Sequence, residues 1–291
     1  MALKGFIMGA SDVVPGVSGG TMAFVLGIYQ ELVLSIKSFD MKAFRLLVRG
    51  RWHELSNHLA WPFLLSVGSG ILLSIFSLAR LLGWLLSNHP TFVWSFFFGL
   101  IAASVGIVSR DVEEWTPSVV ISMILGAVGA YLIVGLMPLQ TPNSPWYLIM
   151  SGAVAICAMI LPGISGAFVL VLLGKYHQIL EAVNQRDLLV LGLVAFGACV
   201  GLIFFSRLLG WLLVKHHEKT LGFLIGLLIG SLRKIWPWKE TSLPFQPTAP
   251  PTNVLPPSFD KETLICFSLM FLGLSCVLLL DRMAKRGITK A

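Results

Sequence analysis

Two apolar stretches of the chain have a length that fits neither one membrane span nor two. A transmembrane helix needs about 20 residues and two such helices need about 40, whereas residues 5–36 and 146–174 fall between these lengths. Each stretch is broken near its middle by Pro-Gly followed by Ser-Gly. Because proline removes a backbone donor and glycine frees the backbone, we predict a re-entrant helical hairpin in each stretch. The turns are expected at Pro15, Gly16, Pro162 and Gly163.

Six further apolar stretches are long enough to cross a bilayer. The chain is 56% hydrophobic and only 12% charged, which is typical of a polytopic membrane protein and not of a soluble domain. The four cysteines lie inside apolar runs and lack disulfide or metal-ligand spacing, so neither a metal nor another cofactor is expected. We predict an all-α polytopic membrane protein with spans at 61–86, 91–108, 117–138, 188–214, 220–236 and 263–280.

The two halves of the chain repeat each other. The hairpin motif Pro15–Gly19 matches Pro162–Gly166, and at the same offset a Leu-Gly-x-Tyr motif at 26–29 matches one at 173–176. A second block, Arg80–Leu86, is identical to Arg207–Leu213. Each half therefore holds one hairpin and three spans, and because three is odd, the halves must be inserted in opposite orientations. Inverted repeats of this kind are a recurring plan of secondary transporters, in which the site lies at the repeat interface.

The domain organisation follows from this repeat. The first repeat covers 1–145 and carries a basic insertion at 37–60, whereas the second covers 146–291 and carries a Pro-rich loop at 237–262. Both are expected to form one integrated membrane unit. Glycines at 222, 226 and 230 place a small-residue face on one helix, which favours close packing against a neighbour over a lipid or ligand groove.

Charged loops indicate the orientation in the membrane. The net charge of +7 comes from cations beside apolar runs, which is a topology signal and not a nucleic-acid footprint. A hairpin at 5–36 keeps Lys4 and the basic insertion on one side, so we expect both chain termini in the cytoplasm. The segments 139–145 and 237–262 are then external.

The hairpins are the first candidate site. Irregular backbone at membrane depth is tolerated only where protein or a polar cavity surrounds it, and a helix that begins there presents N–H groups suited to a phosphate or carboxylate. The alternative is that the glycines only permit tight helix crossing. The expected phosphate-binding residues are Ser18, Gly19, Gly20, Thr21, Ser165 and Gly166.

Arg80 and Arg207 are the second candidates. Each lies inside an apolar span, where a charge is costly and usually has a partner, and a guanidinium matches phosphate oxygens well. The alternative is that both side chains reach out to the lipid headgroups. We expect them to help pass an anion between two access states as the halves rock.

Three further residues are candidates for ion coupling. Asp12 is the only acid in the first hairpin and corresponds to Met159 in the second; it either couples transport to a cation or caps a half-helix. His89 and His216 match across the repeat and could sense protons, although an interfacial histidine without function is the more ordinary interpretation. The coupling ion, H⁺ or Na⁺, and a possible homodimer are left open.

The paired hairpins, the Leu-Gly-x-Tyr motifs and the repeated Arg-Leu-Leu-Gly-Trp block together resemble the bacterial polyprenyl-phosphate transporter family over essentially the whole chain. The resemblance implies a flippase, without catalytic residues, that returns undecaprenyl phosphate from the outer to the inner leaflet of the bacterial cytoplasmic membrane. The lipid is then reused in peptidoglycan and surface-polysaccharide synthesis. The expected partners are this lipid and membrane lipids, with no nucleic acid.

Two other functions remain open at this stage. The same anion site would serve a small soluble anion, in which case a sealed aqueous funnel is expected. An intramembrane lipid phosphatase is the other alternative, but the spacing from Ser206-Arg207 to His216 does not fit a phosphatase motif and no aspartate completes a triad.

Overall fold

The structure is a computed structural model that describes residues 1–14, 17–139, 141–142, 144–240 and 252–288. In these residues the fold is helical apart from one antiparallel pair of two-residue strands. The elements are α1 (Ala2–Asp12), α2 (Gly19–Val25), α3 (Tyr29–Lys37), α4 (Met41–Val48), α5 (Trp52–His58), α6 (Trp61–Asn88), α7 (Pro90–Val108), α8 (Pro117–Val134), α9 (Pro145–Ile160), α10 (Gly166–Leu172), α11 (Tyr176–Gln185), α12 (Leu188–Lys215), α13 (His217–Ile235), β1 (Lys239–Glu240), β2 (Thr252–Asn253) and α14 (Lys261–Ile288).

Five of these helices are long and apolar enough to cross a membrane, and a sixth span results if the bent pair α10 and α11 is counted as one. The five segments are Trp61–Leu78, Pro90–Val108, Pro117–Val134, Leu188–Lys215 and Lys261–Arg282. Only 11% of the α12 segment is buried inside the protein, so most of its apolar surface faces outward, as lipid contact requires. The protein is a multi-pass membrane protein, which confirms the predicted fold class.

The expected span at 220–236 forms α13, which is not among the five. Its 19 residues include four charged ones, two in the first turn and two in the last. The apolar part between them is deeply buried, with Leu224 and Ile225 at 0% exposure. Because a helix of 19 residues is about 28 Å long, α13 is long enough to cross the hydrocarbon core, and its assignment as a span remains a prediction.

Corresponding helices of the two halves form corresponding pairs. α1 packs along α6 and α9 packs along α12, and the closest approaches occur at matching glycines. A side chain at Gly5 would overlap the carbonyl of Val67, and one at Gly152 would overlap the carbonyl of Val194. The repeat seen in the sequence therefore extends to the way these helices cross.

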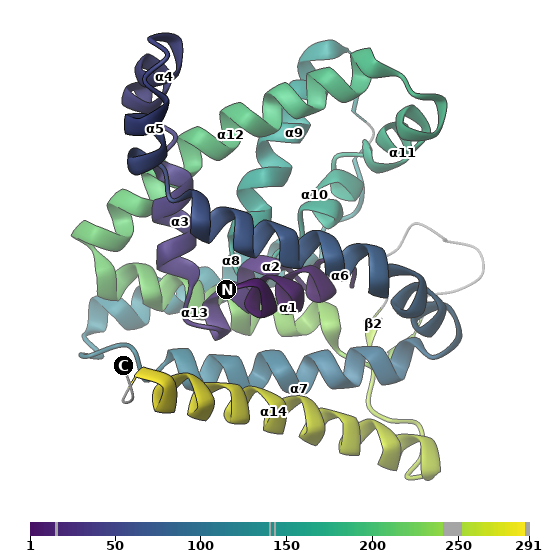
Figure 1. The fold of residues 1–291 in the computed structure, drawn as a ribbon. Helices are drawn as coiled ribbons and strands as arrows, with labels where there is room; N and C mark the ends of the chain where they lie inside the picture. The colour runs from purple at the N-terminus through teal and green to yellow at the C-terminus, as the bar shows by residue number, and fades with distance from the viewer. Residues whose placement is uncertain (15–16, 140, 143, 241–251, 289–291) are drawn as a thin grey trace.

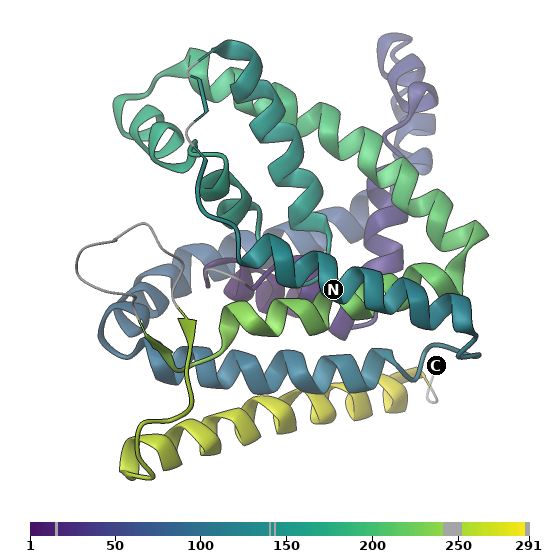
Figure 2. The same ribbon diagram turned by 180° about the vertical axis from the view of Figure 1, so that it is seen from behind.

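The last helix of each half packs on the other half. α8 lies against α13 and α14 lies against α7 (Figures 1 and 2). Gly226 of α13 contacts Met123 of α8, and Gly99 of α7 contacts Met270 of α14 in the same way. The predicted packing role of the α13 glycines is confirmed, because Gly222 and Gly230 also lie directly against α8. Helices α7, α8, α13 and α14 thus form a shared bundle, with the pairs α1–α6 and α9–α12 beside it.

Each predicted hairpin stretch contains a second break that lies after its short helix. The glycines two residues beyond the ends of α2 and α10, Gly27 and Gly174, both have a positive φ, of 66° and 65°. In both places the residue after the glycine donates back to the last turn of the helix: Ile28 N–H bonds the Ala23 carbonyl, and Lys175 N–H bonds the Leu170 carbonyl, each at 2.9 Å. This is the Schellman motif, which needs glycine at the left-handed position. It explains why the Leu-Gly-x-Tyr motif occurs in both halves.

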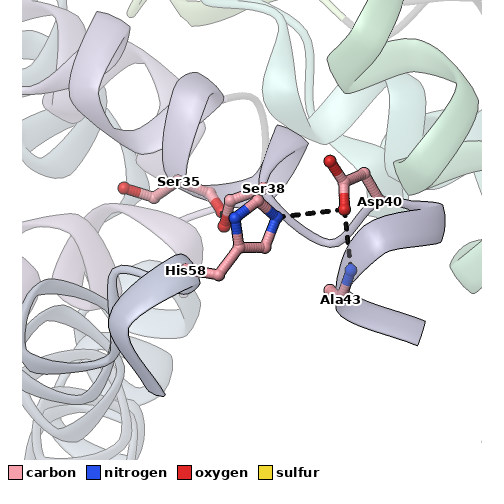
Figure 3. Close-up of polar contacts among 5 residues, drawn as sticks. All are labelled: Ser35, Ser38, Asp40, Ala43 and His58. Atoms are coloured by element: carbon pink, nitrogen blue, oxygen red, sulfur yellow. Dashed lines mark hydrogen bonds and ion pairs between the residues drawn. The ribbon is translucent and has the colours of Figure 1, made fainter. Parts of the chain in front are cut away.

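The insertion at 37–60 forms the small helical unit α4–α5, which stands apart from the bundle (Figure 1). It has its own apolar cluster, made by Ala43, Leu46, Leu55 and Leu59. Asp40 accepts a hydrogen bond from Ala43 N–H at 2.8 Å and another from the His58 ring at 3.0 Å (Figure 3). Partial desolvation opposes ionisation of Asp40, but these hydrogen bonds together lower the pKa of its carboxyl.

Candidate functional site

The tip of the first hairpin is capped by its own side chains. Ser18 is the N-cap of α2, and its hydroxyl oxygen accepts a hydrogen bond from Thr21 N–H at 3.2 Å. Asp12, at the end of α1, accepts a hydrogen bond from Gly19 N–H at 2.6 Å. The predicted turn residues Pro15 and Gly16 lie outside the described residues. The capping role considered for Asp12 is therefore present, since its carboxylate takes up a free donor of α2.

The tip of the second hairpin rests on α13. Gly163 has a φ of 88°, and a Cβ there would lie 2.8 Å from both the Leu227 carbonyl oxygen and the Ser231 hydroxyl. Ser165 is the N-cap of α10 and is 9% exposed, but its side chain makes no capping hydrogen bond. The second tip thus has a serine at the position of Ser18 without the hydrogen bond that Ser18 makes.

The two tips are in direct contact. The Thr21 hydroxyl accepts a hydrogen bond from Gly163 N–H at 2.9 Å and is 3.1 Å from the Ser18 hydroxyl. Ser18 in turn donates to the Leu161 carbonyl at 3.4 Å. Gly20 faces the end of α9 so closely that a Cβ would lie 2.6 Å from the Ile160 carbonyl oxygen. Residues that lie far apart in the sequence therefore meet at one junction, which we call the hairpin junction (Asp12, Ser18–Thr21 and Leu161–Gly166).

The hairpin junction is closed in this structure. Ser18 is 1% exposed and Thr21 is 0% exposed. Two backbone N–H groups that were predicted to bind an anion already have partners within the protein. Gly19 N–H donates to Asp12, and Thr21 N–H donates to Ser18. An anion could bind here only after the tips separate and these internal acceptors are displaced.

The two arginines are placed differently from the tips. Arg80 and Arg207 are exposed side chains on α6 and α12, and neither makes a hydrogen bond or ion pair with any residue the structure describes. Arg207 lies within a membrane-spanning segment, whereas Arg80 lies two residues beyond one. This structure does not bring them into the hairpin junction, and their part in phosphate binding remains a prediction.

The two histidines are corner residues. His89 lies between α6 and α7, and His216 lies between α12 and α13, with nearly identical backbone angles. Each packs edge-on against the tryptophan five residues before it, at 5.7 Å for Trp84 and 5.6 Å for Trp211. These contacts give both histidines a structural role, and a role in ion coupling stays a prediction.

Sequence reasoning missed a lysine next to the second tip. The Lys234 ammonium lies 4.3 Å from the centre of the Phe168 ring, and Phe168 belongs to the first turn of α10. Lys234 is in the last turn of α13, one helical turn after the Ser231 that Gly163 contacts. The sequence did contain a signal that could have identified Lys234. The repeat aligns Lys234 with Ile107, so this cation exists in one half only.

Comparison with known proteins decides the family. The VCA0040-like family model, described as undecaprenyl phosphate translocase-like, matches residues 8–249. The chain belongs to this family. This confirms the resemblance drawn from the hairpin and Arg-Leu-Leu-Gly-Trp motifs.

Two curated relatives share most of the length of the chain. A polyprenyl-phosphate transporter of Vibrio cholerae serotype O1 is 46% identical over 239 residues, which is 82% of this chain and 78% of the relative. A polyprenyl-phosphate transporter of Staphylococcus aureus is 32% identical over 263 residues, which is 83% of this chain and 87% of the relative. A comparison with solved structures found no match.

Proposed function

We propose that this protein carries undecaprenyl phosphate from the outer to the inner leaflet of the bacterial cytoplasmic membrane, where the lipid is reused for cell-wall and surface-polysaccharide synthesis. The observation that carries this proposal is family membership, with a relative named as a polyprenyl-phosphate transporter that is 46% identical over 82% of the chain. On this proposal the protein binds and moves its substrate and performs no chemistry on it.

The hairpin junction supports the proposal physically. A phosphomonoester on a long apolar tail needs a polar path for its headgroup only, because the tail can stay in lipid. Hydroxyl and N–H donors from both hairpins converge at the junction, and such donors replace the water that a phosphate loses in the membrane. We place the headgroup between the separated tips, with Ser18, Thr21 and Ser165 as hydroxyl donors.

Alternating access then consists of opening the junction toward one side at a time. The last helix of each half, α8 or α14, packs on the other half and so holds the shared bundle together. This packing favours movement of the hairpins and of the pairs α1–α6 and α9–α12 over rocking of intact halves. The matching glycine crossings in both halves support inverted repeats as the basis of two equivalent open states.

Asp12 links this cycle to an ion. Its carboxylate holds Gly19 N–H while the junction is closed, and a phosphate that takes over this donor would face a negative charge at short range. Uptake of H⁺ or Na⁺ by Asp12 at that step removes the repulsion. Transport into proteoliposomes under a proton gradient and then under a sodium gradient identifies the ion, and indifference to both gradients would rule out coupling.

The proposed function is tested in intact cells. Undecaprenyl phosphate on the outer surface is measured with an impermeant phosphate-binding probe, in cells that contain this protein as the sole carrier and in cells depleted of it. Depletion should raise surface exposure of the lipid, and restoration should lower it. Unchanged exposure in both cases would refute the substrate assignment.

The proposed orientation is tested with single cysteines in a cysteine-free background. Asn57→Cys lies in the α4–α5 unit and Ser258→Cys lies just before α14, and both positions are exposed. An impermeant maleimide should label Ser258→Cys in intact cells but reach Asn57→Cys only after permeabilisation. Labelling of both in intact cells would contradict the inverted topology.

A further inference from the structure

Lys234, in the last turn of α13, and Lys239, in the strand β1 that follows it, turn toward aromatic rings of other helices. The Lys234 ammonium lies over Phe168 of α10, at 4.3 Å from the ring centre, and the Lys239 ammonium lies over Trp94 of α7, at 4.7 Å. Lys239 also donates a hydrogen bond to the backbone carbonyl of Lys234. Both lysines are partly buried, so the two cations lie together where α7, α10 and α13 meet.

This pair of cations lacks an acidic partner within salt-bridge distance in the described part of the chain. Among the residues that the structure describes, neither lysine forms a salt bridge. Helices α7 and α10 contain no charged residue, and segment 241–251, which follows Glu240, contains none in its sequence. Burial and the nearby Lys234 charge lower the pKa of Lys239 to about 8. Cations that have lost water without gaining a carboxylate are expected to face an anion that comes from outside the chain.

The neighbouring Arg233, unlike the two lysines, has both a hydrogen-bond acceptor and an aromatic ring on one partner residue. Arg233 donates to the Tyr131 carbonyl at 3.0 Å and lies over the Tyr131 ring at 4.2 Å, on the side of a cavity of about 450 Å³. Lysines commonly bond the last carbonyls of a helix, which accounts for the bond from Lys239 to the Lys234 carbonyl. This bond uses only one of the three N–H donors of the Lys239 ammonium. Among the residues that the structure describes, the Lys234 ammonium has one partner, the Phe168 ring.

The cation pair lies beside the second hairpin tip. Phe168 follows Gly166 in the first turn of α10, and Ser231, one turn before Lys234 on α13, contacts Gly163. An anion held by the two lysines would therefore be next to the hairpin junction. The pair also breaks the symmetry of the repeat, because Ile107 occupies the place of Lys234 in the first half.

We propose that Lys234 and Lys239 form a loading site for the phosphomonoester headgroup, on the side of the membrane that the α13 C-terminus faces. This inference rests on the proposed function and adds a difference between the two sides of the membrane. The access state that is open to the lysines binds the headgroup more tightly than the other access state does. In the proposed topology this is the external side, where the lipid is collected.

The test measures binding of a short-chain polyprenyl monophosphate to the purified full chain in nanodiscs. Lys234→Met and Lys239→Met should each weaken binding at least tenfold, whereas Lys261→Met, an exposed lysine at the start of α14, should leave binding unchanged. Binding to the wild type should weaken as the pH rises from 7 to 9, because Lys239 loses its proton in this range, and Lys239→Arg should keep its affinity at pH 9.

A second measurement uses the wild type alone, so that it does not depend on folding of the variants. Acylation of Lys234 and Lys239, followed by mass spectrometry, should slow when the lipid phosphate is present, while acylation of Lys261 should not change. The loading site is overturned if both methionine variants bind the lipid phosphate within twofold of the wild type, or if the lipid phosphate does not slow acylation of Lys234 and Lys239. Either result leaves the proposed function standing. Binding of inorganic phosphate without binding of the lipid phosphate overturns both.

Discussion

The hydrogen bond from Gly163 N–H to the Thr21 hydroxyl is the most direct link between the two hairpin tips, at 2.9 Å. Thr21→Val keeps the shape of the side chain and removes the acceptor. Gly163 N–H then lies in a buried position without a partner, because Thr21 is 0% exposed. A buried donor left unpaired costs about 1–3 kcal/mol, which corresponds to a loss of roughly 5- to 150-fold in the population of the closed junction.

Hydrogen exchange of the peptide that contains Gly163 measures this population. Thr21→Val should speed hydrogen exchange of this peptide by roughly 5- to 150-fold. Transport into proteoliposomes should fall, because the closed junction lies between the two open states. Thr21→Ser keeps the hydroxyl and is the matched control, with exchange close to that of the wild type. Equal exchange in Thr21→Val and the wild type would refute the junction as the link between the hairpins.

Three further predictions concern other parts of the chain. Arg80→Ala and Arg207→Ala should abolish lipid return without preventing membrane insertion, and normal return in both variants would remove the arginines from the mechanism. Gly226→Leu should separate α13 from α8, because a side chain there overlaps the Met123 carbonyl; the thermal midpoint should drop, and an unchanged midpoint would contradict the crossing. Asp40→Ala should cost the α4–α5 unit about 1 kcal/mol, seen as faster hydrogen exchange of 41–48, whereas Asp40→Asn should keep most of the cap. Because the pKa of Asp40 is lowered in the folded protein, its contribution is full at neutral pH and should be lost as the pH falls through that lowered value.

Much of the fold was readable from the sequence because its constraints are local. Lengths of apolar runs predict the membrane helices, and a proline at the first or second position of α6, α7, α8 and α9 matches the starts of those helices. The hairpin motif predicted an interruption near Pro162 correctly. The second break, after α2 and α10, was present in the sequence as Leu-Gly-x-Tyr, but a glycine becomes a helix end only where its backbone turns left-handed.

The candidate site was only partly readable because its contacts are long-range. Ser18 and Thr21 were named from their motif, but the bond from Gly163 N–H to Thr21 joins residues 142 positions apart. Charge alone singled out Arg80 and Arg207, although both side chains are exposed in the structure. Lys234 passed unnoticed because a lysine in the last turn of a helix is ordinary, and only the structure shows it over Phe168.

The exchange of α8 and α14 between the halves has a consequence for synthesis. When residues 1–145 have entered the membrane, the face of α8 that packs on the α13 glycines has no partner until α13 follows. The first half is therefore an incomplete subunit that depends on the rest of the chain. Co-expressed halves should therefore assemble with each other, whereas either half alone should be degraded. On the proposed inverted topology, a single-repeat ancestor would reach the same packing as two identical chains inserted in opposite directions, with the last helix of each chain packed on the other. Fusion of two such genes would fix the stoichiometry and free each copy to diverge, as Lys234 and Ile107 have done.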